Sequence, residues 1–289
     1  MLQLAPETIA GQLRLVAWLG TFGILISFFA SRYGFFRFKE KPHHVLISTA
    51  SLIELFGLFV VISLFGPLIL RDLIASIGKM MGVQGGEWRF YLMTMIQIAS
   101  EILLIFLISL YAFAHKRIDM AKIFKTGKAP IWRDFGIGIL AWAISFPVVA
   151  AVDGLMETLT ISLFGSVGPP QIAVQFIRAL AKSSYLWVGI FITVIIAPLI
   201  EEFIFRGCIQ TYLRNRMSQM KAIVYSSILF ALIHFAPGQG IGNLPLLVSI
   251  FTFGLYLGFV YERQGSLFTS FALHATFNAL SLVRILYVP

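Results

Sequence analysis

Eight long apolar stretches constrain the fold of this chain more than any other feature of its sequence. A helix needs about 20 mostly apolar residues to cross the ~30 Å hydrocarbon core of a bilayer. Hydrophobic residues make up 58% of the 289 residues and charged residues only 12%, whereas a soluble domain carries about 25% charged residues. We therefore predict an all-α, polytopic membrane helix bundle of about eight transmembrane helices. They fall at residues 13–31, 45–70, 90–114, 135–152, 186–213, 222–236, 244–261 and 266–288.

The lysines and arginines are distributed unequally between the two sides of this predicted bundle. If the N-terminus lies outside, the inside connections hold 15 of them and the outside segments hold 7. Because basic loops stay in the cytoplasm, the bias favours both termini outside, and a plasma-membrane location if the cell is prokaryotic. Membrane topology also accounts for the net charge of +9. We therefore expect the lipid bilayer, and no nucleic acid, as a partner.

The connection formed by residues 115–133 is basic, with interleaved apolar side chains such as Ile123 and Phe124. Two interpretations stay open: an interfacial helix on the anionic inner leaflet, or a solvated basic loop. We place a domain boundary at its end. Residues 1–134 then comprise the N-terminal transmembrane helices and this loop, and residues 135–289 comprise a second transmembrane unit.

Ionisable side chains inside the apolar stretches are the candidates for chemistry, because such groups are costly to place in a membrane. They concentrate after residue 200. One stretch contains two adjacent carboxylates and an arginine, another ends near a histidine, and the last carries a histidine and an asparagine four residues apart, hence on one helix face. These residues are Glu201, Glu202, Arg206, His234, His274 and Asn278.

Three of these groups lie at the same depth in the predicted bundle, measured from the nearest flanking charge. The separations are 13 residues for Glu201 from Arg214, 13 for His234 from Lys221, and 11 for His274 from Arg263. At ~1.5 Å per helical residue, all three lie roughly 16–20 Å from the inner boundary. A common depth is the necessary condition for a shared site, and it is met.

Purely structural roles compete with chemistry for some of these groups. Glu202 and Arg206 are spaced i,i+4 in the favourable order and can form an intrahelical ion pair, and intramembrane histidines often hydrogen-bond between helices. Glu201 points about 100° away from Glu202, so a second carboxylate at mid-membrane depth has no such explanation. Other groups show no recognisable spacing, and we interpret two as interhelical hydrogen-bond residues and two as loop residues: Glu54 and Glu101, and His43 and His44.

Taken in order, the motifs resemble those of the CPBP family (CAAX proteases and bacteriocin-processing enzymes), also called the abortive-infection family. The type II CAAX prenyl endopeptidase belongs to this family. The matching motifs are Glu201-Glu202-x-x-x-Arg206, Phe230-x-x-x-His234 and His274-x-x-x-Asn278. The resemblance covers roughly residues 185–289, so residues 135–289 would form the catalytic core.

The resemblance implies an intramembrane glutamate-type endopeptidase that hydrolyses a peptide bond with an activated water. Glu201 would take a proton from the water with help from His234. A carboxylate in a low-dielectric cavity is a stronger base near neutral pH than one in water. His274 and Asn278 would donate hydrogen bonds to the oxyanion that develops on the substrate carbonyl.

Supporting roles and partners follow from the same resemblance. Glu202 and Arg206 would orient Glu201 and neutralise part of the local charge. We expect no cofactor and no metal, and Cys208 has no arrangement that indicates a nucleophile. The substrate would be a peptide or protein, recruited through the membrane or through a prenyl group, and the active-site cavity would face the cytoplasm.

Two alternatives remain open from the residues themselves. Glu201, His234 and His274 could instead form a His₂Glu zinc site like that of several metalloproteases. Alternatively, buried Glu, His and Arg side chains suit a non-enzymatic transporter or scaffold, although the internal repeats common in transporters are not visible.

Overall fold

The computed structural model describes residues 6–38, 45–83, 85, 88–115, 120–166 and 168–287, and helices dominate this part of the chain. The elements are α1 (Pro6–Arg32), α2 (Thr49–Met80), α3 (Trp88–His115), α4 (Met120–Phe124), α5 (Ile131–Phe164), α6 (Ile172–Leu180), α7 (Leu186–Phe191), η2 (Ile192–Ile196), α8 (Ala197–Glu202), η3 (Phe203–Gln210), α9 (Thr211–Arg214), α10 (Gln219–Leu232), η4 (Pro237–Gly242), α11 (Asn243–Gln264) and α12 (Leu267–Tyr287).

Every predicted apolar stretch contains a helix, which confirms the all-α polytopic bundle. Six helical segments of the described chain are long and apolar enough to cross a membrane. The remaining two are α10, a shorter apolar helix of 14 residues, and α12, with 21 residues. The six are Ile9–Arg32, Thr49–Met80, Trp88–Ala114, Ile131–Phe164, Leu186–Arg214 and Pro237–Gln264.

Helix α5 extends well beyond the predicted range of 135–152. Its 34 residues correspond to about 50 Å, longer than the hydrocarbon core. The helix continues through Asp153, whose Oδ1 accepts a 2.7 Å hydrogen bond from the hydroxyl of Ser249 in α11. The helix ends at Gly165, whose φ of 78° is the left-handed conformation that glycine adopts easily.

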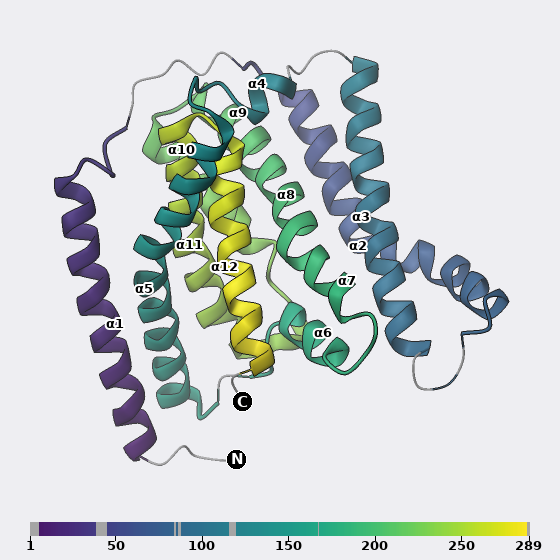
Figure 1. Cartoon of the computed structure of the whole chain (residues 1–289), viewed down its shortest axis with the longest axis horizontal. Coiled ribbons are helices and arrows are strands. Elements are labelled where there is room, and N and C mark those ends of the chain that lie inside the picture. The colour runs from purple at the N-terminus through teal and green to yellow at the C-terminus, as the bar shows by residue number, and fades with distance from the viewer. Residues whose placement is uncertain are drawn as a thin grey trace.

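The helices pack around α5, α11 and α12. Helix α1 packs against α5, which in turn contacts both α11 and α12, while α10 packs against α11. Helices α2 and α3 form a hairpin on the other flank, and α2 contacts η3. Figure 1 shows the start of α1 and the end of α12 at one end of the bundle, with α4 and α9 at the opposite end. Because α1 contacts α5, contacts cross the predicted domain boundary, and that boundary stays a prediction.

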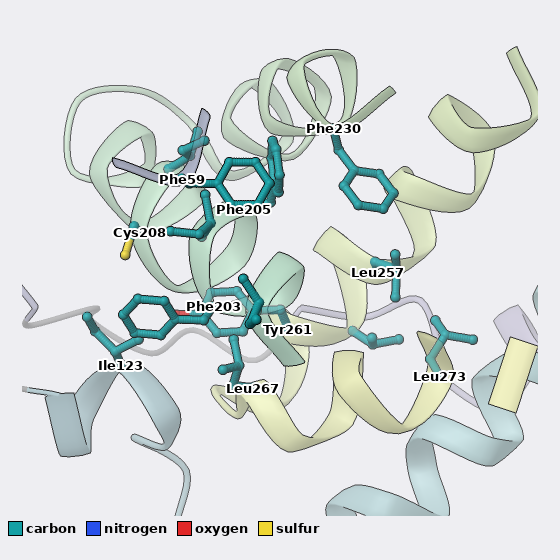
Figure 2. Packing of buried hydrophobic residues seen from close by; sticks show 14 of the residues in the cluster. Phe59, Ile123, Phe203, Phe205, Cys208, Phe230, Leu257, Tyr261, Leu267 and Leu273 are labelled. Atoms are coloured by element: carbon teal, nitrogen blue, oxygen red, sulfur yellow. The ribbon is translucent and has the colours of Figure 1, made fainter. Parts of the chain in front are cut away.

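A large cluster of buried side chains surrounds the helix that runs from α7 to α9. Large side chains from several helices are fully buried there, including Phe205, Phe230 and Leu257, as Figure 2 shows. The outer helices present large apolar side chains outward instead, for example Trp18 (76% exposed) and Phe113 (79% exposed). A helix bundle in lipid requires apolar side chains on its outer surface and closely packed side chains in its interior.

In the described part of the 115–133 connection, α4 packs against η3 and α12. The interfacial helix and the solvated basic loop both stay predictions for the connection as a whole. Ile123 in α4 is buried against Gly207 of η3, and the ring of Phe124 stacks on Phe203. The backbone amides of residues 126 and 127 donate to the carbonyl of Gly265. The apolar side chains of α4 and the backbone amides that follow it are thus packed against, or hydrogen-bonded to, the rest of the bundle. Residues 116–119, and His43 and His44, lie outside the described residues.

The contact between Ile123 and Gly207 yields a test of this docking. A Cβ on Gly207 would lie only 2.7 Å from Ile123 Cγ2, so Gly207→Ala should destabilise the protein by about 1–3 kcal/mol. In an Ile123→Ala background the same substitution should cost markedly less, measured as thermal midpoints of the purified protein. Gly136→Ala is the matched control, because nothing lies within 4 Å of its Cβ position. Equal costs in both backgrounds would contradict the docked arrangement.

Candidate active site

Two π-helical segments interrupt the helix that carries the paired carboxylates. Between Leu186 and Arg214 the chain is helical throughout, but η2 and η3 adopt π-helical hydrogen bonding on either side of the six-residue α8. Glu201 and Glu202 close α8. Single π-turns within α-helices are rare and occur frequently at functional sites. The apolar pattern of this stretch carries no sign of them.

Glu202 is the centre of a fully buried polar network. Its side chain and that of Arg206 are both 0% exposed, with Arg206 Nε 3.4 Å from Glu202 Oε2. The predicted i,i+4 ion pair therefore exists, but it extends further. The Nδ1 atom of His274 in α12 lies 3.0 Å from Glu202 Oε1. Because an ionised carboxylate only accepts hydrogen bonds, Nδ1 carries the proton of this bond.

Arg206 makes contacts with two further helices. Its Nη2 donates to the carbonyl of Gly254 in α11 at 3.3 Å, and its guanidinium lies 4.5 Å from the ring centroid of Phe230 in α10. A cation over an aromatic face is attracted by the ring quadrupole. Phe230 belongs to the Phe230-x-x-x-His234 motif, but its contact with Arg206 was not predicted, and the backbone carbonyl of Gly254 gives no sequence signal at all.

Glu201 differs from its neighbour in what it contacts. Its side chain is 20% exposed, and its Oε2 lies 3.9 Å from His274 Nε2. That distance exceeds a direct hydrogen bond, so both atoms remain able to contact a third group such as water. His274 thus lies between two carboxylates, bonded to Glu202 through one ring nitrogen and facing Glu201 with the other.

His234 and Asn278 lie at the edge of this cluster. His234 Nδ1 donates to the carbonyl of Phe230 at 2.8 Å, which leaves Nε2 as the other hydrogen-bonding atom of the ring. The Phe230 ring contacts both histidines, with centroids 5.0 Å from His234 and 5.8 Å from His274. Asn278 Nδ2 donates to the carbonyl of Thr193 at 2.9 Å. The structure therefore links Glu202 to Arg206 and His274 directly and places Glu201 3.9 Å from His274. His234 is connected to His274 through the Phe230 ring, and Asn278 contacts the Thr193 carbonyl.

The remaining intramembrane carboxylates have different partners. Glu54 accepts a 2.5 Å hydrogen bond from Tyr111 across α2 and α3, which confirms its interhelical interpretation. Glu101 accepts from Gln97 at 2.8 Å within α3, so the bond seen there is intrahelical. Within the described ranges, no group of three or more His, Cys, Asp or Glu side chains is arranged to hold a metal ion. The ligand set of the zinc alternative is not gathered.

Removing the buried cation should unbalance the network. We expect Arg206→Ala to destabilise the protein by about 3–5 kcal/mol, because it leaves the Glu202 carboxylate buried without its counter-charge. Adding Glu202→Gln should restore part of that loss, since no unpaired charge then remains. Arg216→Ala, at an exposed position that follows the same helix, should stay within about ±0.5 kcal/mol. Thermal denaturation of the purified variants measures all three, and a double variant no more stable than Arg206→Ala would refute the charge argument.

Comparison with known proteins supports the resemblance seen in the motifs. Residues 183–280 match the family model described as "Type II CAAX prenyl endopeptidase Rce1-like". An uncharacterized protein of Mycoplasma capricolum is 26% identical over 240 residues, which span 80% of this chain and 66% of the relative, just under two thirds of its length. No solved structure matches the chain. The segment that holds all six candidate residues thus matches an Rce1-like family model, and this match is consistent with the CPBP-type motifs.

Proposed function

We propose that this protein is an intramembrane endopeptidase in which Glu201 activates the water that hydrolyses a peptide bond. The contrast between two adjacent carboxylates carries the proposal. Glu202 is fully buried and engaged by Arg206 and His274, whereas Glu201 keeps 20% of its side chain exposed and faces His274 Nε2 across 3.9 Å. A base must be accessible to the water that it deprotonates, and of the two carboxylates Glu201 is the one with exposed surface.

The two histidines would complete the activation of water. His234 donates through Nδ1 to a backbone carbonyl, so its Nε2 is free to accept a hydrogen bond from the same water. Glu202 orients His274 through Nδ1, as the carboxylate of a catalytic triad orients its histidine. Its Nε2 is thereby directed to the side of Glu201. The proton taken by Glu201 can then pass to the leaving amine, as general acid–base catalysis requires.

The oxyanion of the tetrahedral intermediate needs hydrogen-bond donors. We assign this role to Asn278 together with His274, which lie one helical turn apart on the same face of α12. Because His274 already donates to Glu202 through Nδ1, it would donate to the oxyanion through Nε2 in its imidazolium form, in which both ring nitrogens carry a proton. The Asn278 amide nitrogen carries two hydrogens, of which one is used by the Thr193 carbonyl, so one hydrogen can reach a substrate. Substrates would be peptides or proteins at the membrane, approached from the cytoplasmic side, with a prenylated C-terminus as the first class to test.

The decisive measurement uses a farnesylated peptide ending in a CAAX sequence, with the purified protein in liposomes. Glu201→Gln should lower turnover by about 10²–10⁴-fold, because without the base neutral water is a poor nucleophile. Cys208→Ser is the matched control on the same helix and should retain turnover. Wild-type turnover in Glu201→Gln, or its loss in a folded Cys208→Ser protein, would refute the assignment.

Two further arms separate the alternatives. Turnover that is lost with a zinc-selective chelator and restored by added zinc would favour the His₂Glu metalloenzyme, whereas a glutamate-type enzyme keeps its activity. An unprenylated peptide of the same sequence shows whether the prenyl group is recognised. A transporter or scaffold would cleave neither peptide, and its membranes would show no new protein termini relative to Glu201→Ala membranes.

A further inference from the structure

Pro198 interrupts the backbone hydrogen bonding of the helix at the junction of η2 and α8. The amide of Ala197 donates to the carbonyl of Ile192, five residues back, which is the π-helical register. In that register the next acceptor is the carbonyl of Thr193 and the next donor is residue 198. Proline has no N–H, so the helix supplies no such bond.

Asn278 provides the missing donor from another helix. Its Nδ2 lies 2.9 Å from the Thr193 carbonyl oxygen. A carbonyl only accepts, so this contact determines which end of the amide group points to Thr193. It also fixes the rotation of the amide plane. One hydrogen of Nδ2 is thereby committed, and the direction of the second is set.

We propose that Pro198 is a positioning residue: by leaving the Thr193 carbonyl without a helical donor, it holds the Asn278 amide in the orientation that presents its second N–H to the substrate carbonyl. This inference rests on the proposed function, in which Asn278 stabilises the oxyanion. An oxyanion donor is effective only when it is oriented before the charge develops, and an unrestrained amide would rotate.

The same bond also ties two parts of the site together. Thr193 precedes α8, which carries Glu201, whereas Asn278 follows His274 by one turn of α12. The bond therefore sets the register of the base-bearing helix against the helix of the oxyanion donors. Interactions that fix reacting groups relative to one another act mainly on turnover and less on substrate binding.

A thermal double-mutant cycle tests the link without any activity assay. Any residue other than proline at 198 restores a backbone donor: in the π register its own amide reaches the Thr193 carbonyl, and in the α register the Ala197 amide does. Asn278→Ala should therefore lower the Tm of the full-length protein in detergent by about 2–6 °C. In a Pro198→Ala background the fall should be less than half as large. Pro67→Ala, in α2, is the control and should leave the effect of Asn278→Ala unchanged.

Kinetics with the farnesylated peptide test the positioning role. Pro198→Ala should lower kcat by roughly 10-fold with KM within about twofold, a smaller loss than the ~10²–10³-fold expected for Asn278→Ala. Pro67→Ala should keep both constants. If Pro198→Ala does not fold, Pro198→Ser supplies the same backbone donor and replaces it in both experiments.

The outcomes separate this inference from the proposed function. Equal Tm shifts in the two backgrounds, or a wild-type kcat in a folded Pro198→Ala protein, would overturn the inference while cleavage that depends on Glu201 stands. Cleavage that is independent of Glu201 would overturn the proposed function and, with it, the catalytic part of the inference, even if the thermal coupling is present. Coupled Tm shifts with a selective loss of kcat would support the inference.

Discussion

The buried ion pair between Glu202 and Arg206 is the interaction on which the site depends. Both side chains are 0% exposed within a segment long and apolar enough to cross a membrane. A charge in such a place is tolerated only when it is paired and hydrogen-bonded. The ion pair therefore requires polar or aromatic groups of the neighbouring helices to lie within contact distance of it. The pair contacts three groups on other helices: the Gly254 carbonyl of α11, the Phe230 ring of α10 and the His274 imidazole of α12. These contacts connect all three helices to η3 and α8.

This arrangement leaves Glu201 in a special position. With Glu202 engaged on both oxygens by Arg206 and His274, the compensating charge and the oriented imidazole are already in place before a substrate arrives. Glu201 lies next to that network, 3.9 Å from His274 Nε2, and makes no direct hydrogen bond to it. A preorganised polar environment of this kind stabilises developing charge without further reorganisation. In the proposed function, the two adjacent glutamates would therefore have different roles: Glu202 would form the polar environment, and Glu201 would act as the base within it.

Much of this could be predicted from the sequence. The bilayer limits a spanning element to a helix of about 20 residues or more, so apolar stretches alone predict the bundle. Depth counting brought Glu201 and His274 into one layer, because every transmembrane helix rises by the same amount per residue. Depth counting does not predict which way a side chain points around its helix. His234 illustrates this limit, because the sequence assigns it the same depth and the structure shows the Phe230 ring in contact with both His234 and His274.

Other features could not be predicted, for identifiable physical reasons. The docking of Ile123 depends on the missing side chain of Gly207, 84 residues later in the chain, and no local pattern encodes that fit. The role of Thr193 is carried by its backbone carbonyl, which every residue type possesses. The hydrogen bond that extends the ion pair to His274 also needs tertiary structure, since i,i+4 spacing reports only contacts within one helix.

The π-helical segments explain why the orientation of Glu201 and Glu202 is difficult to predict from the sequence. A π-turn accommodates one more residue than an α-turn, so residues beyond it are rotated relative to a continuous α-helix. With η2 before α8 and η3 after it, the short segment that carries both glutamates can face α12 in a direction that the surrounding apolar periodicity does not specify. Pro198, which cannot donate within the helix, stands at the junction of η2 and α8. The two π-helical segments thus flank the paired glutamates, and the Thr193 carbonyl, which lies in η2, accepts the hydrogen bond that links this helix to Asn278 of α12.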